Sequence, residues 1–255
     1  MFLNSFSTMV GTWMGSDSFQ HCFLIVPFVL YLVWDKRTLL ASLTPAPDKL
    51  GLILAGIASF GWLVGSVASV QLVQELSLVG MLDALVLAVF GRQVFRVLLF
   101  PLGFLFLMVP MGDALQPFLR DWTAQFLVWS IDALGYQISS DGYFITVIAE
   151  TGRYPFEVAR ECSGLRYLTV MLAIGLATAH LFFRGTKKRL AVIALAVALP
   201  LVVNWVRALG IVLLAVKTEG RHGADIDHLV YGFWFFLTVL LLFVLACWRA
   251  GVLPT

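Results

Sequence analysis

A cysteine with nucleophilic potential lies at Cys162, where a polar loop gives way to a long apolar segment. The start of a helix favours the thiolate form of a cysteine, and so do the guanidinium groups of Arg160 and Arg166 nearby in sequence. We expect Ser163 to cap this helix and Arg166 to share a helical face with Cys162. The alternative is that Cys162 is a small buried apolar side chain, as most single cysteines are.

Two further side chains with catalytic potential follow in the next apolar segments. Arg207 lies within a segment long enough to cross a membrane, where an unpaired charge is costly, and Asn204 lies one turn before it. Arg207 could instead extend its guanidinium to the membrane surface. His228 begins the last segment and could act as a general base, or could be an interfacial residue beside acidic caps. His222 is a weaker competitor for the base.

The composition indicates an all-α polytopic membrane protein. The 255 residues are 60% hydrophobic and 13% charged, with a mean hydropathy of +0.93, and no soluble domain can bury so much apolar surface. Cys22 and Cys247 fall within apolar segments, so no disulfide framework is indicated. We find no phosphate-binding loop, no dinucleotide motif and no metal-ligand spacing, so we expect no cofactor, metal or nucleic-acid partner.

Seven apolar segments approach the roughly 20 residues that a membrane-spanning helix needs. The first is short and could begin near Trp13. The segments are residues 19–34, 50–70, 76–90, 94–110, 164–183, 190–216 and 229–248. We expect residues 1–255 to form a single integral membrane domain, with a polar extracytoplasmic insert at 111–161 that leads into Cys162. Nothing in the first residues reads as a cleaved signal peptide.

Basic residues predict the orientation of these segments. Of the 17 Lys and Arg residues, 10 fall on one side: Lys36, Arg37, Lys49, Arg92, Arg96, Arg184, Lys187, Lys188, Arg189 and Arg249. The positive-inside rule therefore places the C-terminus in the cytoplasm and the insert outside. Cys162, Arg207 and His228 then converge on the outer membrane face.

The insert has its own pattern. Residues 114–134 carry apolar side chains at helical spacing and predict an amphipathic helix at the membrane interface. Residues 143–148 are aromatic and β-branched, a turn follows, and residues 154–158 could return as a second strand. We predict a short β-hairpin here, with an irregular loop as the alternative.

Three motifs together resemble the exosortase/archaeosortase family of polytopic membrane transpeptidases. They are Glu161-Cys162-Ser163-Gly164-Leu165-Arg166-Tyr167-Leu168, then Asn204-Trp205-Val206-Arg207, then His228-Leu229-Val230-Tyr231-Gly232-Phe233. The resemblance extends forward to residues 16–27 and covers nearly the whole chain. The family usually has about eight spans, one more than found here. Its members often carry alanine at the position of Glu161.

The resemblance implies that Cys162 is the nucleophile and that Arg207 and His228 are its partners, with Arg166, Asn204 and Glu161 in support. It implies an enzyme of the bacterial inner membrane, associated with exopolysaccharide producers, whose active site faces the periplasm. Its substrates would be exported proteins that end in a sorting signal of the PEP-CTERM type. A thioester acyl-enzyme would form at Cys162, and a membrane lipid is a candidate acceptor.

Other functions compete with this interpretation. A transporter or channel lined by Asp83, Asn204 and Arg207 would account for buried charge, although no repeated halves are visible. A plain intramembrane cysteine hydrolase would use the same site and transfer the acyl group to water. For Asp83 and Glu75 we expect a pairing with arginine or an interhelical hydrogen bond. His21 and His180 are expected to be structural.

Overall fold

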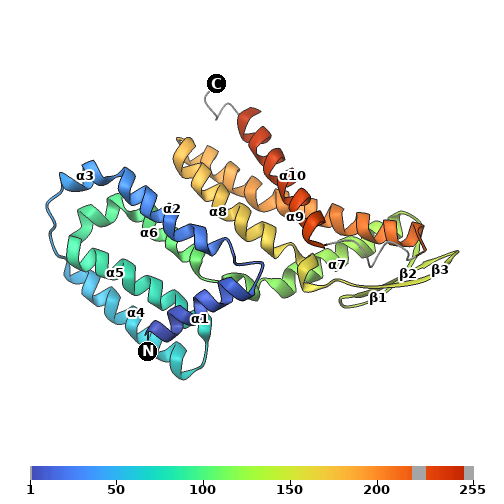
Figure 1. Cartoon of the computed structure of the whole chain (residues 1–255), viewed down its shortest axis with the longest axis horizontal. Helices are drawn as coiled ribbons and strands as arrows, with labels where there is room; N and C mark the ends of the chain where they lie inside the picture. Colours follow the sequence, from blue (N-terminus) through green and yellow to red (C-terminus); the bar gives the residue numbers. More distant parts are fainter. Residues whose placement is uncertain (1, 220–227, 250–255) are drawn as a thin grey trace. The chain divides into compact units, whose positions relative to one another are not determined.

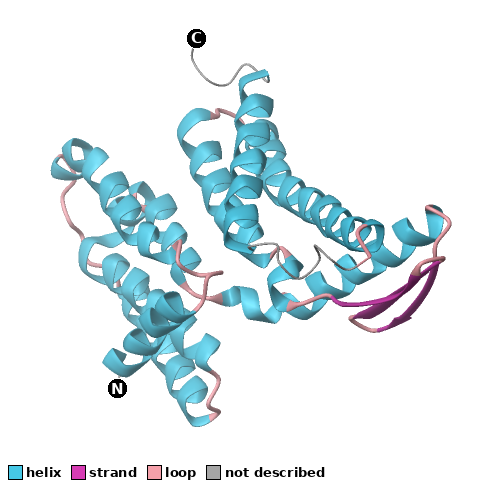
Figure 2. Ribbon diagram, turned by 45° about the vertical axis from the view of Figure 1, so that its right-hand side comes forward, coloured by secondary structure: helices cyan, strands magenta, loops and turns pink. Residues whose placement is uncertain are grey.

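The computed structural model describes residues 2–219 and 228–249, and gives only the backbone of Glu161 and of residues 228–231. The described chain is mostly helical and contains one small antiparallel sheet (Figure 2). It divides into two compact units, Met1–Met111 and Gly112–Thr255. The division falls where the predicted polar insert begins. That residues 1–255 act as a single membrane domain stays a prediction.

The first unit is built from helices. In chain order they are α1 (Phe2–Gly15), α2 (Cys22–Asp35), α3 (Arg37–Ala41), α4 (Lys49–Val67), α5 (Gln71–Val97), α6 (Leu99–Leu105) and the 3-10 turn η1 (Phe106–Met108). Helix α1 was not predicted from the sequence. It is tied to the unit by Trp13, whose buried indole N–H donates to the Met108 carbonyl at 2.9 Å.

Helices α4 and α5 pack against each other as an antiparallel pair (Figure 1). Glycine permits their close approach, because a Cβ atom on Gly51 would lie 2.2 Å from the backbone nitrogen of Ala88. Helix α5 is interrupted at Gly91, where φ is +80°. The chain before α4 folds back onto this break, and the N–H groups of Ala46 and Asp48 donate to the carbonyls of Phe90 and Ala88.

The second unit carries the sheet and the last long helices. Its elements are η2 (Met111–Ala114), α7 (Gln116–Ala133), β1 (Gln137–Asp141), β2 (Phe144–Ala149), β3 (Gly152–Glu157), the 3-10 turn η3 (Arg160–Ser163), α8 (Leu165–Phe182), α9 (Thr186–Lys217) and α10 (His228–Arg249). Helix α9 packs against both α8 and α10. The helix predicted at 114–134 is confirmed as α7, and its place at the membrane interface stays a prediction.

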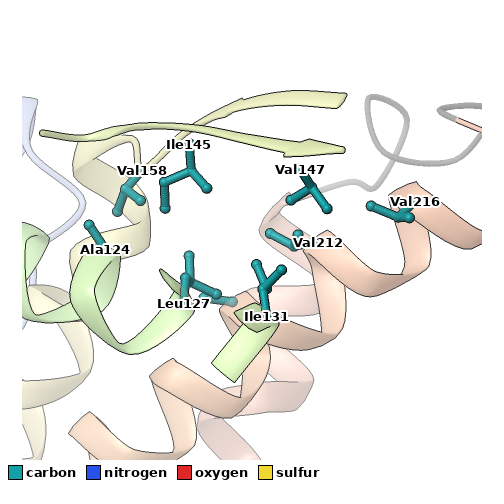
Figure 3. Close-up of a cluster of buried hydrophobic side chains, with 9 residues drawn as sticks. Ala124, Leu127, Ile131, Ile145, Val147, Val158, Val212 and Val216 are labelled. Carbon is teal, nitrogen blue, oxygen red and sulfur yellow. The ribbon is translucent and has the colours of Figure 1, made fainter. Parts of the chain in front are cut away.

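The predicted hairpin is also confirmed, as β2 and β3, with Ile145 paired to Phe156 and Val147 to Tyr154. The sequence did not predict β1, which extends the sheet to three strands in the order β1-β2-β3. One face of the sheet covers a buried apolar cluster, shown in Figure 3. The cluster joins the sheet to α7 and α9 through Ala124, Leu127, Ile131, Ile145, Val147, Val158, Ala208, Val212 and Val216.

The structure does not confirm the count of seven spans. Within the described residues, five helices are long and apolar enough to cross a membrane: Lys49–Val67, Gln71–Val97, Leu165–Phe182, Thr186–Lys217 and Gly232–Arg249. The predicted first span is a helix of 14 residues, Cys22–Asp35. The predicted third span and the start of the fourth are fused in α5, and the rest of the fourth is the short apolar stretch Leu99–Met108.

Candidate active site

Cys162 lies in the turn η3, between the end of the sheet and the start of α8. Its backbone N–H donates to the carbonyl of Ala159 at 3.0 Å. Gly164 follows with φ of +79°, in the left-handed region, so η3 and α8 are not one continuous helix. The expectation that Cys162 and Arg166 share a helical face is therefore wrong.

The helix starts one residue later than expected. Gly164 is the N-cap of α8, and Leu165 is its first residue. The Ser163 hydroxyl nevertheless accepts a hydrogen bond from the Leu165 N–H at 3.3 Å, so it does satisfy one backbone donor at this helix start. Ser163 is 2% exposed, which makes this contact part of the protein interior.

Asn204 connects the cysteine turn to α9. Its side-chain N–H donates to the carbonyl oxygen of Cys162 at 2.9 Å, and Asn204 is 1% exposed. Gly164 makes the approach possible, because a Cβ atom there would lie 2.9 Å from the side-chain carbon Cγ of Asn204. The left-handed turn and the absence of a side chain at Gly164 thus both serve this contact.

Arg207 lies one turn beyond Asn204 on the same helix. Its guanidinium donates to the Asn204 side-chain oxygen across a long 3.5 Å contact, and its buried Nε has no hydrogen-bond partner among the described residues. The guanidinium carbon lies 6.0 Å from the ring centre of Tyr167 and 5.7 Å from that of Phe235. Aromatic faces therefore flank a buried cation that retains donor capacity.

Tyr167 also joins α8 to the last helix. Its hydroxyl donates to the carbonyl of Gly232 in α10 at 3.4 Å, and its ring lies 5.8 Å from that of Phe235. Helix α10 begins at His228, one turn before Gly232, but the side chain of His228 is outside the described part of the chain. His222 lies outside the described residues altogether.

The sheet and α7 also support the cysteine turn. Cys162 is half-buried and packs against the apolar cluster of Figure 3. Arg120 of α7 donates through Nε to the Val158 carbonyl at 2.8 Å, four residues before Cys162. Its guanidinium also lies 3.8 Å from the ring centre of Tyr143. The strand that leads into the turn is therefore anchored to α7.

Comparison with known proteins decides the family. A model of the family described as Transmembrane exosortase (Exosortase_EpsH) matches residues 13–245. The chain belongs to the exosortase family. No curated protein and no solved structure matches it. Exosortase membership, together with several long apolar helices, makes this a multi-pass membrane protein and implies a peptidase or transpeptidase.

The structure brings together three of the residues that the sequence predicted for this exosortase site. Cys162, Asn204 and Arg207 are linked through the Asn204 amide. Arg166 is exposed at the start of α8, and the Glu161 side chain is not among those described. Sequence reasoning gave no role to Gly164 or Tyr167, although both stand inside the quoted cysteine motif.

Other polar residues of the exosortase fold lie in the first unit. Asp83 has a buried Oδ1 with no hydrogen-bond partner in the described chain, and Glu75 accepts from Gln71 within α5 at 2.7 Å. Within the described chain Glu75 thus bonds inside its own helix, where an arginine or a partner on another helix was expected.

No group of three metal-binding side chains occurs among residues 2–219 and 228–249. The transport pathway through Asp83, Asn204 and Arg207 stays a prediction, with its residues divided between the two units.

Proposed function

We propose that this exosortase-family protein cleaves the C-terminal sorting signal of exported proteins, with Cys162 as the nucleophile. The observation that carries the proposal is the Asn204 bridge. One buried amide holds the backbone of the candidate nucleophile and contacts the candidate cation. Buried polar contacts of this kind hold side chains in a defined geometry, which is what covalent catalysis requires.

In the proposed reaction, the Cys162 thiol gives its proton to His228 and its sulfur forms a bond to the scissile carbonyl carbon. The tetrahedral intermediate collapses as the carbon–nitrogen bond breaks, and His228 returns the proton to the leaving amine. A thioester remains on Cys162. An acceptor amine or water then attacks the thioester, the carbon–sulfur bond breaks, and the thiol is regenerated.

Arg207 stabilises the thiolate or the oxyanion that forms on the scissile carbonyl. Three features support this role: the guanidinium is buried, aromatic rings flank it, and its Nε has no partner among the described residues. A donor that is already positioned and shielded from water is worth more to a developing charge than the same donor in water.

The substrate class follows from the resemblance and the predicted orientation. A sorting signal consists of a short recognition motif, a transmembrane helix and a basic cytoplasmic tail. Because the basic tail stays inside, the motif emerges on the outer face, at the predicted level of Cys162. A membrane lipid is the candidate acceptor in this setting.

Processing of a sorting-signal precursor in cells tests the proposal. We expect Cys162→Ala to abolish processing, and Arg207→Ala to slow it about 10²–10³-fold, the usual effect of removing an oxyanion donor. Cys247→Ala is the matched control, since Cys247 is buried in a separate apolar cluster of α8, α9 and α10. Normal maturation by both Cys162→Ala and Arg207→Ala, at normal membrane abundance, would refute the assignment.

Mass spectrometry of the mature substrate separates transfer from hydrolysis. An added mass at the new C-terminus identifies a transpeptidase, whereas a free carboxylate identifies a cysteine hydrolase that uses the same site. The nucleophile assignment is tested by the variants above and does not depend on this outcome.

A further inference from the structure

A polar pocket lies in the first unit, where α4 ends and α5 begins beside α1. Its volume is about 390 Å³. The lining combines hydroxyl and amide side chains with one indole, and none of its lining residues carries a charge. The principal contributors are Asn4, Ser5, Trp62, Ser66, Gln71 and Gln74. None of these residues takes part in the proposed cysteine chemistry.

Hydrogen bonds hold the walls of this pocket in place. The Trp62 indole N–H donates to the Ser5 hydroxyl at 3.1 Å, and that hydroxyl donates to the Gln74 side-chain oxygen at 3.0 Å. Gln74 in turn donates to the Gly65 carbonyl at 3.3 Å. Ser5 and Trp62 are each 6% exposed, so the network is part of the interior. The pocket is therefore formed before any ligand arrives.

A buried carboxylate orients the remaining amide. Glu75 is 1% exposed and accepts from the Gln71 side-chain nitrogen at 2.7 Å. Because that nitrogen is engaged, Gln71 can offer its side-chain oxygen as an acceptor to the pocket. Ser66 contributes a hydroxyl that can donate or accept. The pocket lining thus offers both donors and acceptors.

The lining selects the chemistry of a ligand. Ligand pockets generally measure roughly 300–1,000 Å³ and are mostly apolar with a few polar groups. This pocket is at the lower end of that size range, and its lining is mostly polar instead of mostly apolar. Such a lining suits a small group that carries many hydroxyls. No cation in the lining can pair with a phosphate, and no carboxylate faces an amine.

We propose that this pocket binds a neutral polyhydroxylated group, such as a sugar ring or inositol. The group could come from a free saccharide or from the headgroup of a glycolipid. The sequence-based orientation puts this end of α4 and α5 on the outer face, where both sources are accessible. The site is independent of Cys162 and constitutes a second binding function of the chain.

Isothermal titration calorimetry on the full-length protein tests the proposal, in a detergent without a sugar headgroup. The probes are methyl glucoside, myo-inositol, phosphatidylcholine vesicles with monoglucosyl diacylglycerol, and phosphatidylcholine vesicles alone. We expect saturable binding, weakened about tenfold by Ser66→Leu, which removes a hydroxyl and fills the pocket. Tenfold corresponds to about 1.4 kcal/mol. Ser59→Leu is the matched control, because Ser59 is exposed on the same helix outside the lining.

The outcomes separate the two sources. Binding of a free probe shows that the polyhydroxylated group suffices, whereas binding of the glycolipid vesicles alone identifies a lipid-borne group, and both support the proposal. Absence of saturable binding, equal affinity in Ser66→Leu, or equal binding of vesicles without glycolipid would overturn it. Cys162→Ala should bind as the unmodified protein does, so failure of the cysteine mechanism leaves this test intact.

Discussion

At the scale of single residues, Gly164 is a position of the candidate site that does not accommodate a side chain. Gly164→Ala places a Cβ atom 2.9 Å from Asn204 and forces alanine to φ of +79°, which costs roughly 1–2 kcal/mol for an L-residue. We expect processing to fall at least about tenfold, since the Asn204 contact is displaced. Gly210→Ala in α9 is the control, because a Cβ atom there meets nothing within 4 Å. Equal activity of the two variants would contradict this account.

Asn204 itself allows a second test. Asn204→Leu keeps the volume of the side chain and removes the hydrogen bond to the Cys162 carbonyl. Loss of a buried hydrogen bond that leaves its partner unsatisfied costs about 1–3 kcal/mol. We expect the activation free energy of precursor cleavage to rise by a comparable amount, so that cleavage is slower. Reactivity of Cys162 towards a thiol probe should change in parallel. A variant that folds, cleaves and reacts normally would exclude a positioning role.

The sequence could identify the residues with chemical potential at this scale but not their local geometry. Cys162 and Arg207 were recognisable because a single cysteine at a helix start and an arginine within a span both require an explanation. The left-handed turn at Gly164 could not be recognised from the sequence, because it depends on Asn204, some 40 positions away in the chain. The part played by Tyr167 likewise depends on the packing of three helices.

At the scale of elements, a substitution can test whether the attachment of the sheet to α7 supports the cysteine turn. Arg120→Met removes the hydrogen bond to the Val158 carbonyl and the contact over Tyr143. We expect faster amide hydrogen exchange through β2 and β3 and slower precursor cleavage, because Val158 leads into the cysteine turn. Arg153→Met, on an exposed position of β3, should leave exchange unchanged. Identical exchange in the two variants would argue against the anchor.

The start of α4 predicts a dependence on pH. The Leu50 N–H and then the Arg92 guanidinium hold the pKa of the Asp48 carboxyl below its ordinary value of 3.8. The ionised carboxylate therefore stabilises the fold above that value, and this contribution is lost as the pH falls through the lowered folded pKa. We expect Asp48→Asn to flatten the acid dependence of the melting temperature below about pH 4.

Arg92→Gln provides the comparison for this titration. It removes the second of the two interactions and leaves the first, so its acid dependence should lie between those of the unmodified protein and Asp48→Asn. An unchanged acid profile in Asp48→Asn would show that Asp48 does not contribute to the stability of the α4–α5 pair.

Elements with strong periodicity were predictable and polar ones were not. Helix α7 and the strands β2 and β3 were expected from apolar spacing and from β-branched and aromatic residues. Strand β1 reads Gln-Ile-Ser-Ser-Asp and carries little strand propensity of its own, because pairing with β2 creates it. Gly91 lies between the spans predicted to end at residue 90 and to begin at 94, but α5 continues beyond the break there to Val97.

At the scale of the whole molecule, the orientation in the membrane stays a prediction that labelling can test. In a background carrying Cys22→Ala, Cys162→Ala and Cys247→Ala, we expect Ser140→Cys in β1 to react with an impermeant maleimide in intact cells. Lys187→Cys, at the start of α9, should react only after lysis, because basic loops remain in the cytoplasm. Reaction of Lys187→Cys in intact cells would invert the topology. The sequence predicted this orientation from charge, whereas the two compact units arise from contacts that no local pattern reveals.

Helix α9 is longer than a bilayer requires. From Thr186 to Arg207 the helix rises about 32 Å, close to the roughly 30 Å of hydrocarbon in a membrane. In the predicted orientation the basic first turn of α9 would lie at the inner boundary. Arg207 would then lie where acyl tails give way to headgroups, and the turns of Val212 and Val216 would continue beyond it. The proposed thioester, held at that depth, would meet bulk water on one side and tail-anchored amphiphiles on the other. Both water and the amphiphiles would have access to the thioester. The rate at which each attacks it would therefore decide which of them completes the turnover.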